Sequence, residues 1–159
     1  MAEEKKQKNL AELIRKAGKE QRTIEVQFPL IKGFYATISY ASKFVMNQIR
    51  EAAIVTETNL RTNVVEESFD DEKLREQYSW HLLKDWRGLT GEKLKGIIPG
   101  FEVADEDAEK DIPFDREIAL SLMEVSVEFE NWVVATATTV KNYTKTALQK
   151  EAEIENLKN

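Results

Sequence analysis

The stretch from Ile112 to Ala147 reads IPFDREIALSLMEVSVEFENWVVATATTVKNYTKTA, and it organises the rest of the chain. Pro113 and Asp115 mark a helix start, because proline has no N–H to donate and aspartate can cap a first turn. From there one row recurs in steps of three or four residues, which is the spacing of a single helical face. The row is Ile118, Leu122, Val125, Phe129, Trp132, Thr136, Val140, Tyr143 and Ala147. The pattern predicts one long amphipathic C-terminal helix.

This row changes character along its length. Through Val133 it is large and apolar, so we expect that half to be core, anchored by Phe129. Beyond that point Thr, Ala and Tyr dominate, and threonine is a poor helix former. We therefore expect the second half to be a surface whose helicity depends on a partner. The residues predicted to bind that partner are Trp132, Thr136, Val140, Tyr143 and Ala147.

Composition limits the classes of function. A chain of 159 residues is usually one domain, and 33% of this one is charged. The formal net charge of −6 argues against nucleic acid as the main partner, since phosphate contacts need clustered Lys and Arg. The start, MAEEKKQK, lacks the apolar core of a signal peptide, and no apolar run approaches a membrane span. We expect a soluble intracellular protein without a membrane or nucleic-acid partner.

Two runs with alternating polarity indicate strands on the N-terminal side. Residues 23–28 and 34–40 alternate around a loop that contains Pro29 and Gly33, which predicts a β-hairpin or two neighbouring strands. Residues 10–17 form a short amphipathic segment, either a frayed helix on the domain edge or an arm for self-association. We expect residues 1–9, which are mostly charged, to be a flexible tail.

Several residues in the middle of the chain are typical helix N-caps or C-terminal stops. Ser42 is expected to cap one helix, Asp70 and Asp71 to open a second that ends at Gly88, and Thr90 to cap a short third. The Thr- and Val-rich section 54–69 is compatible with an irregular helix or with a loop, and its pattern does not decide between the two.

These elements predict an α+β fold that is predominantly helical. Its N-terminal β-hairpin packs on four to five helices, and the long amphipathic helix closes the C-terminal side. A single domain is expected over residues 10–149, followed by a charged tail at 150–159.

No residue set selects an enzyme, a metal site or a cofactor. His81 is the only histidine and cysteine is absent, so a multi-histidine metal cage or a zinc–thiolate site cannot form within one chain. The acidic segment 102–111 fails as a calcium loop, because Lys110 replaces the required Gly and Arg116 the closing Glu. The glycine-rich segment 88–96 lacks the Gly-Lys-Ser/Thr of a phosphate-binding loop. We therefore expect no catalytic residues, no bound metal and no cofactor.

The three tryptophans are candidates for partner binding, but the apolar residues near them in the sequence favour packing in the core. Trp80 and Trp132 lie at helical spacing among Leu and Val, and Trp86 precedes Leu89. A place at the rim of a partner-binding surface is the alternative, since tryptophan is enriched in binding hot spots.

Short motifs in residues 23–145 resemble the tail assembly chaperones of long-tailed, siphovirus-like bacteriophages. In that family a hydrophobic-Lys/Arg-Asp-Trp-x-Gly turn precedes an Ile-Pro-Phe-Ser/Asp helix start and an apolar helix with a central Phe. The matching positions here are Asp85, Trp86, Gly88, Pro113, Phe114 and Phe129, which the resemblance implies are structural. The Thr-rich continuation after Trp132 departs from the family pattern.

The resemblance implies binding without catalysis. Such chaperones bind the tape measure protein, help recruit tail-tube subunits, act in the host cytoplasm and are absent from the mature virion. It also implies that this chain would be the shorter product where a frameshift yields a longer fused form. The alternatives are a structural head–tail connector or tail-completion protein of the virion, and a regulatory binder directed at the host.

Overall fold

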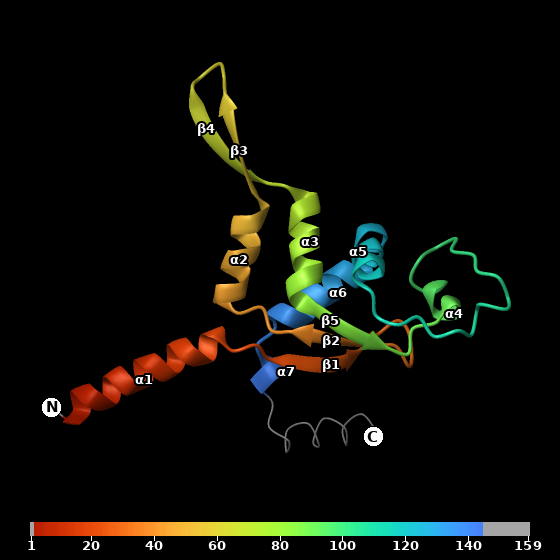
Figure 1. Ribbon diagram of the computed structural model, residues 1–159, viewed down its shortest axis with the longest axis horizontal. Helices are drawn as coiled ribbons and strands as arrows, with labels where there is room; N and C mark the ends of the chain where they lie inside the picture. Colours follow the sequence, from red (N-terminus) through yellow and green to blue (C-terminus); the bar gives the residue numbers. More distant parts are fainter. Residues whose placement is uncertain (1, 145–159) are drawn as a thin grey trace.

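The computed structural model describes residues 2–144, which fold into a small mixed body with two projecting elements (Figure 1). Seven helices and five strands lie in this range. The order is α1 (Ala2–Lys19), β1 (Thr23–Gln27), β2 (Tyr35–Ser39), α2 (Lys43–Ala53), β3 (Ile54–Asn59), β4 (Val64–Phe69), α3 (Asp71–Leu82), β5 (Leu83–Arg87), α4 (Gly91–Leu94), α5 (Arg116–Val125), α6 (Val127–Thr138) and α7 (Lys141–Thr144).

The body is built on a three-stranded antiparallel sheet with the order β1-β2-β5. The predicted hairpin is confirmed, with Ile24 opposite Ile38 and Val26 opposite Ala36. Helices α3, α5 and α6 lie on one side of this sheet (Figure 1). Alternation then places the side chains of Ala36 and Ile38 on the buried face, where both are completely inaccessible.

An aromatic cluster fills the space between the sheet and α6. Phe28 and Phe34 lie at the two ends of the β1–β2 loop, and both rings pack against Phe129 of α6, at 5.8 Å and 6.3 Å between centroids. Trp132 adds a ring 4.9 Å from Phe28. Such pairs stabilise a core beyond their buried area, by about 1 kcal/mol each. The expectation that Phe129 anchors the fold agrees with its complete burial.

The prediction of one long C-terminal helix is wrong. Within the described residues it is replaced by α5, α6 and the single turn α7. Ser126 ends α5 and caps α6, because its backbone is extended and its Oγ accepts the N–H of Phe129 at 3.1 Å. The change of direction leaves Val125 59% exposed although Leu122 and Phe129 are buried. The apolar row keeps its helical spacing across Ser126, so the spacing alone did not reveal the break. The signal that could have revealed it is Ser126 itself, because serine is a preferred N-cap residue.

The second error concerns the segment before Gly88. Helix α3 ends at Leu82, and residues 83–87 form strand β5, which pairs with β2. Arg116 lies over the end of α3, and its Nη1 donates to the carbonyls of Ser79 and Leu83, both at 2.7 Å. The Ser79 carbonyl belongs to the last turn of the helix, where no intrahelical donors remain, and Leu83 is the C-cap residue with which β5 begins. A side chain distant in sequence therefore stabilises the switch from helix to strand.

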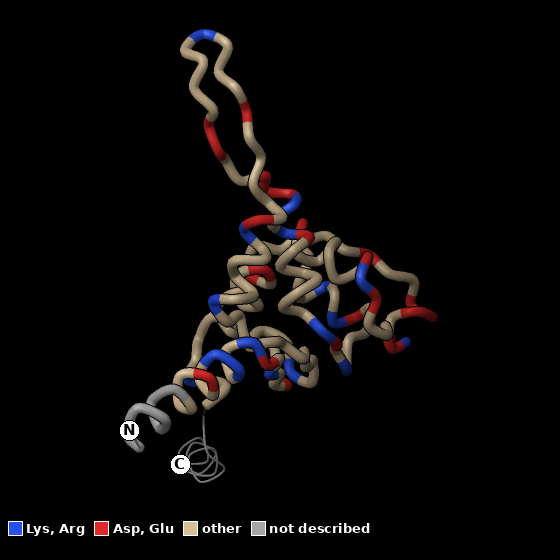
Figure 2. Tube along the Cα trace, turned by 60° about the vertical axis from the view of Figure 1, so that its left-hand side comes forward, with Lys and Arg blue, Asp and Glu red and all other residues tan. Residues whose placement is uncertain are grey.

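The pattern of residues 54–69 is compatible with an irregular helix or a loop, but the structure shows neither. They make the antiparallel hairpin β3–β4, from Ile54 opposite Phe69 to Asn59 opposite Val64. Figures 1 and 2 show this hairpin standing away from the body as an arm. The fold therefore has two sheets where one was expected, and more helices than the four to five predicted.

At the N-terminal end, α1 is longer than the short segment expected near residues 10–17. Its last turn lies beside the start of α2, where Tyr40 and Phe44 face Gly18 and Lys19 across a shallow hollow. The remainder of the helix extends away from the body (Figure 1). The domain boundaries proposed from the sequence stay predictions, and the 150–159 tail lies outside the described residues.

Candidate functional site: an apolar groove between α4 and α5

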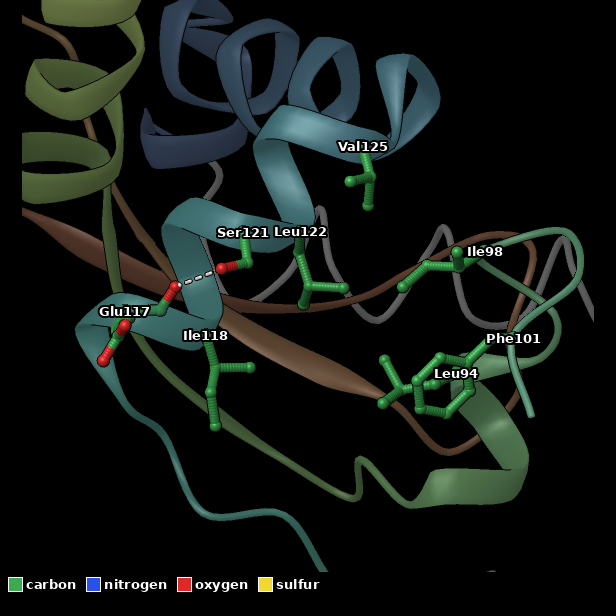
Figure 3. Close-up of a pocket in the computed structure, with 8 residues that line it drawn as sticks. All are labelled: Leu94, Ile98, Phe101, Glu117, Ile118, Ser121, Leu122 and Val125. Atoms are coloured by element: carbon green, nitrogen blue, oxygen red, sulfur yellow. Dashed lines mark hydrogen bonds between the residues drawn. The ribbon is translucent and has the colours of Figure 1, made fainter. Parts of the chain in front are cut away.

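An apolar groove of about 520 Å³ lies between α5 and the segment that contains α4 and the turn after it (Figure 3). Helix α5 presents Ile118, Leu122 and Val125 to it, at the i, i+4, i+7 spacing of one helical face. Across the groove lie Leu94, Ile98 and Phe101, while Glu117 and Ser121 are its polar lining residues. A concave surface of this size and polarity is typical of a binding site.

Local sequence signals build the wall opposite α5. Thr90 caps α4 through its Oγ1, which accepts the N–H of Lys93 at 3.2 Å, as predicted. The chain then turns at Gly100, whose φ of +81° suits glycine. A backbone bond from the N–H of Phe101 to the carbonyl of Ile98, 3.1 Å long, closes the turn. The turn brings the Phe101 ring back over the groove (Figure 3).

The groove has a buried floor and an open rim. Leu94 and Leu122 are 7% and 2% exposed and form its floor. Ile118 and Val125 are 36% and 59% exposed, so the rim offers apolar surface to an incoming group. Fully burying an exposed side chain of this size is worth roughly 1.5–3 kcal/mol, and burial of the part that each rim residue still exposes contributes a fraction of that.

The surroundings of the groove are acidic. Glu117 is exposed at its edge, and the loop 102–111 that starts directly after Phe101 carries six carboxylates and one lysine. The nearby cations are engaged by protein atoms. Lys93 donates its Nζ to the carbonyl of Gly88, Lys95 pairs with Glu92 at 3.1 Å, and Arg116 points its guanidinium at the end of α3. A partner with apolar anchors and flanking basic residues would match this surface.

Two further apolar surfaces are exposed. Leu10, Leu13 and Ile14 of α1 are 57%, 63% and 63% exposed. The β3–β4 arm exposes Leu60 at its tip and, on its strands, Ile54, Val64, Val65 and Phe69. A lone hairpin is marginally stable in water, so partner contacts would stabilise the arm.

Of the five residues predicted to bind a partner, the four that the structure describes lie in different surroundings. Trp132 packs in the aromatic cluster, and Thr136 is 8% exposed. Tyr143 lies against the Tyr40 ring at 5.1 Å. Val140, at 54% exposed, remains open to a partner, and Ala147 lies outside the described residues.

Tyr143 also belongs to the packing of the sheet. Its hydroxyl donates to the carbonyl of Ile38 at 3.1 Å. Burial raises the pKa of this phenol well above its ordinary value, and the nearby Tyr40 acts in the same direction. The bond ties the last described turn of the chain to β2.

The positions carried by the motif resemblance lie close together at the end of β5. The Trp86 ring is buried, its Nε1 donates to the carbonyl of Ile112 at 2.8 Å, and the Phe114 ring packs edge-on at 4.8 Å. Asp85 accepts the N–H of Trp86 through Oδ1 at 2.8 Å. Pro113, which is exposed, lies between the two residues that contact the indole.

Gly88 and Phe129 extend this motif cluster in two directions. Gly88 follows β5 with a φ of +77°, a conformation that other residues rarely adopt. Phe129 joins the cluster through Phe34, whose ring lies 6.3 Å from those of both Trp86 and Phe129. None of these motif residues lines the groove.

Trp80 corrects another prediction. It is 60% exposed on α3 and is not a core residue. The guanidinium of Arg116 lies 4.9 Å from its ring, a cation–π contact that holds the indole at the surface. The core prediction holds for Trp86, which is 5% exposed, and Trp132 is half-buried.

Sequence reasoning missed the groove itself. The sequence predicts a short helix capped by Thr90 and a core role for the row through Val133, and neither prediction indicates a groove. The available signal was the pair of apolar rows on either side of the acidic loop. Their juxtaposition depends on where the loop returns, which neither row reveals alone.

In the part of the chain that the structure describes, no three His, Asp or Glu side chains gather where they could hold a metal ion. Over the same residues, no helix combines the length and apolar character needed to cross a bilayer.

Comparison with known protein families gives a match. Residues 40–154, more than half of the chain, match the model of a family described as YdaY prophage protein. The matched span includes the groove, the β3–β4 arm and the motif cluster, and it starts after α1. Searches of curated proteins and of solved structures returned no match.

Proposed function

The chain belongs to the YdaY prophage protein family and is phage-derived, and we propose that it acts as a tail assembly chaperone without catalytic activity. In this proposal it binds an amphipathic helix of the tape measure protein and helps bring tail-tube subunits to it. It would work in the host cytoplasm and be absent from the mature virion. The observation that carries the proposal is the apolar groove between α4 and α5.

The shape and chemistry of the groove suit a helical partner. Helix-in-groove recognition uses apolar anchors at i, i+3/i+4 and i+7, which enter an apolar cleft. Ile118 and Val125 on one rim, with Ile98 and Phe101 on the other, provide such a cleft. A tape measure protein, which is long and largely helical, would expose many such faces before assembly. The motif resemblance around Trp86 supports the same function.

The projecting β3–β4 arm favours a second candidate, a structural head–tail connector or tail-completion protein. Both outer edges of the arm carry unpaired backbone groups, which can add strands from a neighbouring subunit. A permanent assembly would use such an arm. Mass spectrometry of purified virions separates the two candidates, because a chaperone is missing from the particle and a connector is present.

The direct test is co-expression of the tagged chain with the tape measure protein, followed by affinity purification. Val125→Asp places a charge on the groove rim and should reduce recovery of the partner by about tenfold or more. Val127→Asp is the matched control, since this residue is 73% exposed, lies two positions away and does not line the groove. It should bind like the wild type.

A third variant tests the surface predicted from the sequence. Val140→Asp alters its exposed member without touching the Tyr143 hydrogen bond. Loss of binding in Val140→Asp but not in Val125→Asp would assign the partner to that surface and reject the groove. No co-purification with the wild type, or equal binding by all variants, would overturn the groove proposal.

A further inference from the structure

Helix α1 carries an apolar stripe that the other residues described by the structure leave uncovered. Leu10, Leu13 and Ile14 lie on one side of the helix, and each is more than half exposed. The last turn of α1 lies beside α2, and the remainder of the helix extends away from the body (Figure 1). Because helices in proteins gain most of their stability by packing an amphipathic face, this stripe calls for an occupant.

Pairing of two α1 stripes does not suit the sequence. A coiled coil needs apolar heptads sustained over three or four repeats. Here the apolar positions end after Leu10, Leu13, Ile14 and Ala17, and residues 2–9 contain a single Ala and no larger apolar residue. The stripe is too short for a stable helix pair but long enough to fill a groove.

The α4–α5 groove complements the stripe in shape and in charge. Its floor and rim are apolar, and the loop 102–111 beside it carries six carboxylates and one lysine. The stretch 10–19 of α1 is basic, with Arg15, Lys16 and Lys19 against Glu12. Apolar anchors flanked by cations on α1 would thus meet an apolar groove flanked by carboxylates (Figure 2 shows both charge distributions).

The geometry requires two copies. Figure 1 shows α1 extending from one side of the body, whereas α4 and α5 lie on the opposite side. The connection from α1 to β1 is residues 20–22, too short to carry the helix across the molecule. We propose that α1 of one copy docks in the α4–α5 groove of a second copy.

The contact is heterologous, because two different surfaces of the chain meet. Repeated docking would link copies head to tail, as an open chain or a closed ring. This occupant does not depend on the identity of the phage partner. It covers the groove in the free protein, and a helix of the tape measure protein would compete with it.

Sedimentation velocity of the purified full chain over a range of concentrations tests the inference. The wild type should show concentration-dependent association. Leu10→Gln/Leu13→Gln, which removes two exposed anchors, and Val125→Asp, which charges the groove rim, should each weaken it by about tenfold or more. The controls are Glu12→Gln, on the opposite face of α1, and Val127→Asp, outside the groove. Circular dichroism verifies that every variant keeps its helix content.

A mixing experiment decides between docking modes. The α1 variant keeps an intact groove, and the groove variant keeps an intact α1. An equimolar mixture of the two should form a 1:1 pair and nothing larger, because only one complementary contact remains. A groove variant that associates as the wild type does would indicate pairing through α1 or another surface and would overturn the inference. A monomeric wild type, an unchanged α1 variant, or a mixture that stays monomeric would do the same.

These outcomes are separate from the function test. Self-association is measured on the chain alone, whereas the proposed function is measured by recovery of the tape measure protein. The α1 variant should still bind that partner, since its groove is intact. Loss of self-association in both variants, together with no recovery of the partner by the wild type, would reject the proposed function and retain the inference.

Discussion

The carbonyl oxygen of Gly33 occupies the place where a Cβ at residue 88 would lie, so Gly33 and Gly88 bring the β1–β2 loop directly against the end of β5. The Lys93 Nζ, which donates to the Gly88 carbonyl, lies beside the same contact. The glycine of the Asp-Trp-x-Gly motif therefore serves close backbone packing. It also positions the chain that leads into α4 and hence into one wall of the groove.

Replacement of Gly88 by Ala should lower the free energy of unfolding by about 3 kcal/mol, because a positive φ and a clash with backbone act together. Urea denaturation followed by tryptophan fluorescence measures the change. Gly100→Ala is the matched control, since its φ is +81° but no atom lies within 4 Å of the added Cβ. It should cost about 1 kcal/mol. Equal losses in the two variants would show that the contact with Gly33 contributes nothing.

Ser126→Ala tests the break between α5 and α6. The substitution removes the cap of α6 and leaves the buried N–H of Phe129 without its acceptor, so it should cost about 1–2 kcal/mol. Thermal unfolding by circular dichroism measures it. Ser121→Ala, an exposed position within α5 whose hydroxyl bonds to the Glu117 carbonyl, should change stability by less than about 0.5 kcal/mol. If Ser126→Ala were neutral or stabilising, packing rather than the serine cap would determine where α5 ends and α6 begins.

The sequence predicted the elements whose signals are local. Alternation revealed the β1–β2 hairpin, and the side chains of Ser42, Asp70, Thr90 and Asp115 cap helices where their spacing indicated. The prediction failed where a contact between residues distant in sequence determines the secondary structure. Strand β5 follows α3 without a turn, because β2 supplies its hydrogen bonds and Arg116 donates to the carbonyls of Ser79, in the last turn of the helix, and of Leu83, its C-cap residue. Neither partner is adjacent in sequence.

The candidate site was predicted less well for the same reason. The apolar row through Ile118, Leu122 and Val125 is real, but its outer members line a groove because the 94–101 segment stops short of covering them. Conversely, Thr136 and Tyr143 looked available from their polarity and are taken up by packing and by the bond to Ile38. Polarity along one helix does not reveal which neighbour covers it.

The β3–β4 arm carries a like-charge pair. Glu57 lies directly opposite Glu66, and facing carboxylates destabilise a ladder. Glu57→Lys converts the pair to opposite charges and should slow amide hydrogen exchange across residues 54–69 by roughly twofold to fivefold. The unfolding of the body should not change. Glu67→Lys, which faces Thr56, is the control and should leave exchange within about twofold of the wild type. Equal slowing by both variants would point to net charge rather than to the facing pair.

His81 should make stability depend on pH near neutrality. Burial lowers the pKa of its imidazole below the ordinary 6.5, and the nearby Lys84 and Arg116 act in the same direction. The unfolded chain therefore binds the proton more readily, so the free energy of unfolding should fall as pH drops from 7.5 to 5.5. The loss should be small, because the ring is only half-buried.

The comparison with His81→Gln isolates this effect. Chemical denaturation at each pH gives the difference in unfolding free energy between wild type and variant, and this difference should decline on acidification. Glu25, whose pKa is lowered by its hydrogen bond to Arg87, titrates below its ordinary 4.5 and does not contribute in this window. A difference that is constant between pH 7.5 and 5.5 would show that the imidazole is equally easy to protonate in both states. A difference that grows on acidification would mean that folding favours the charged ring.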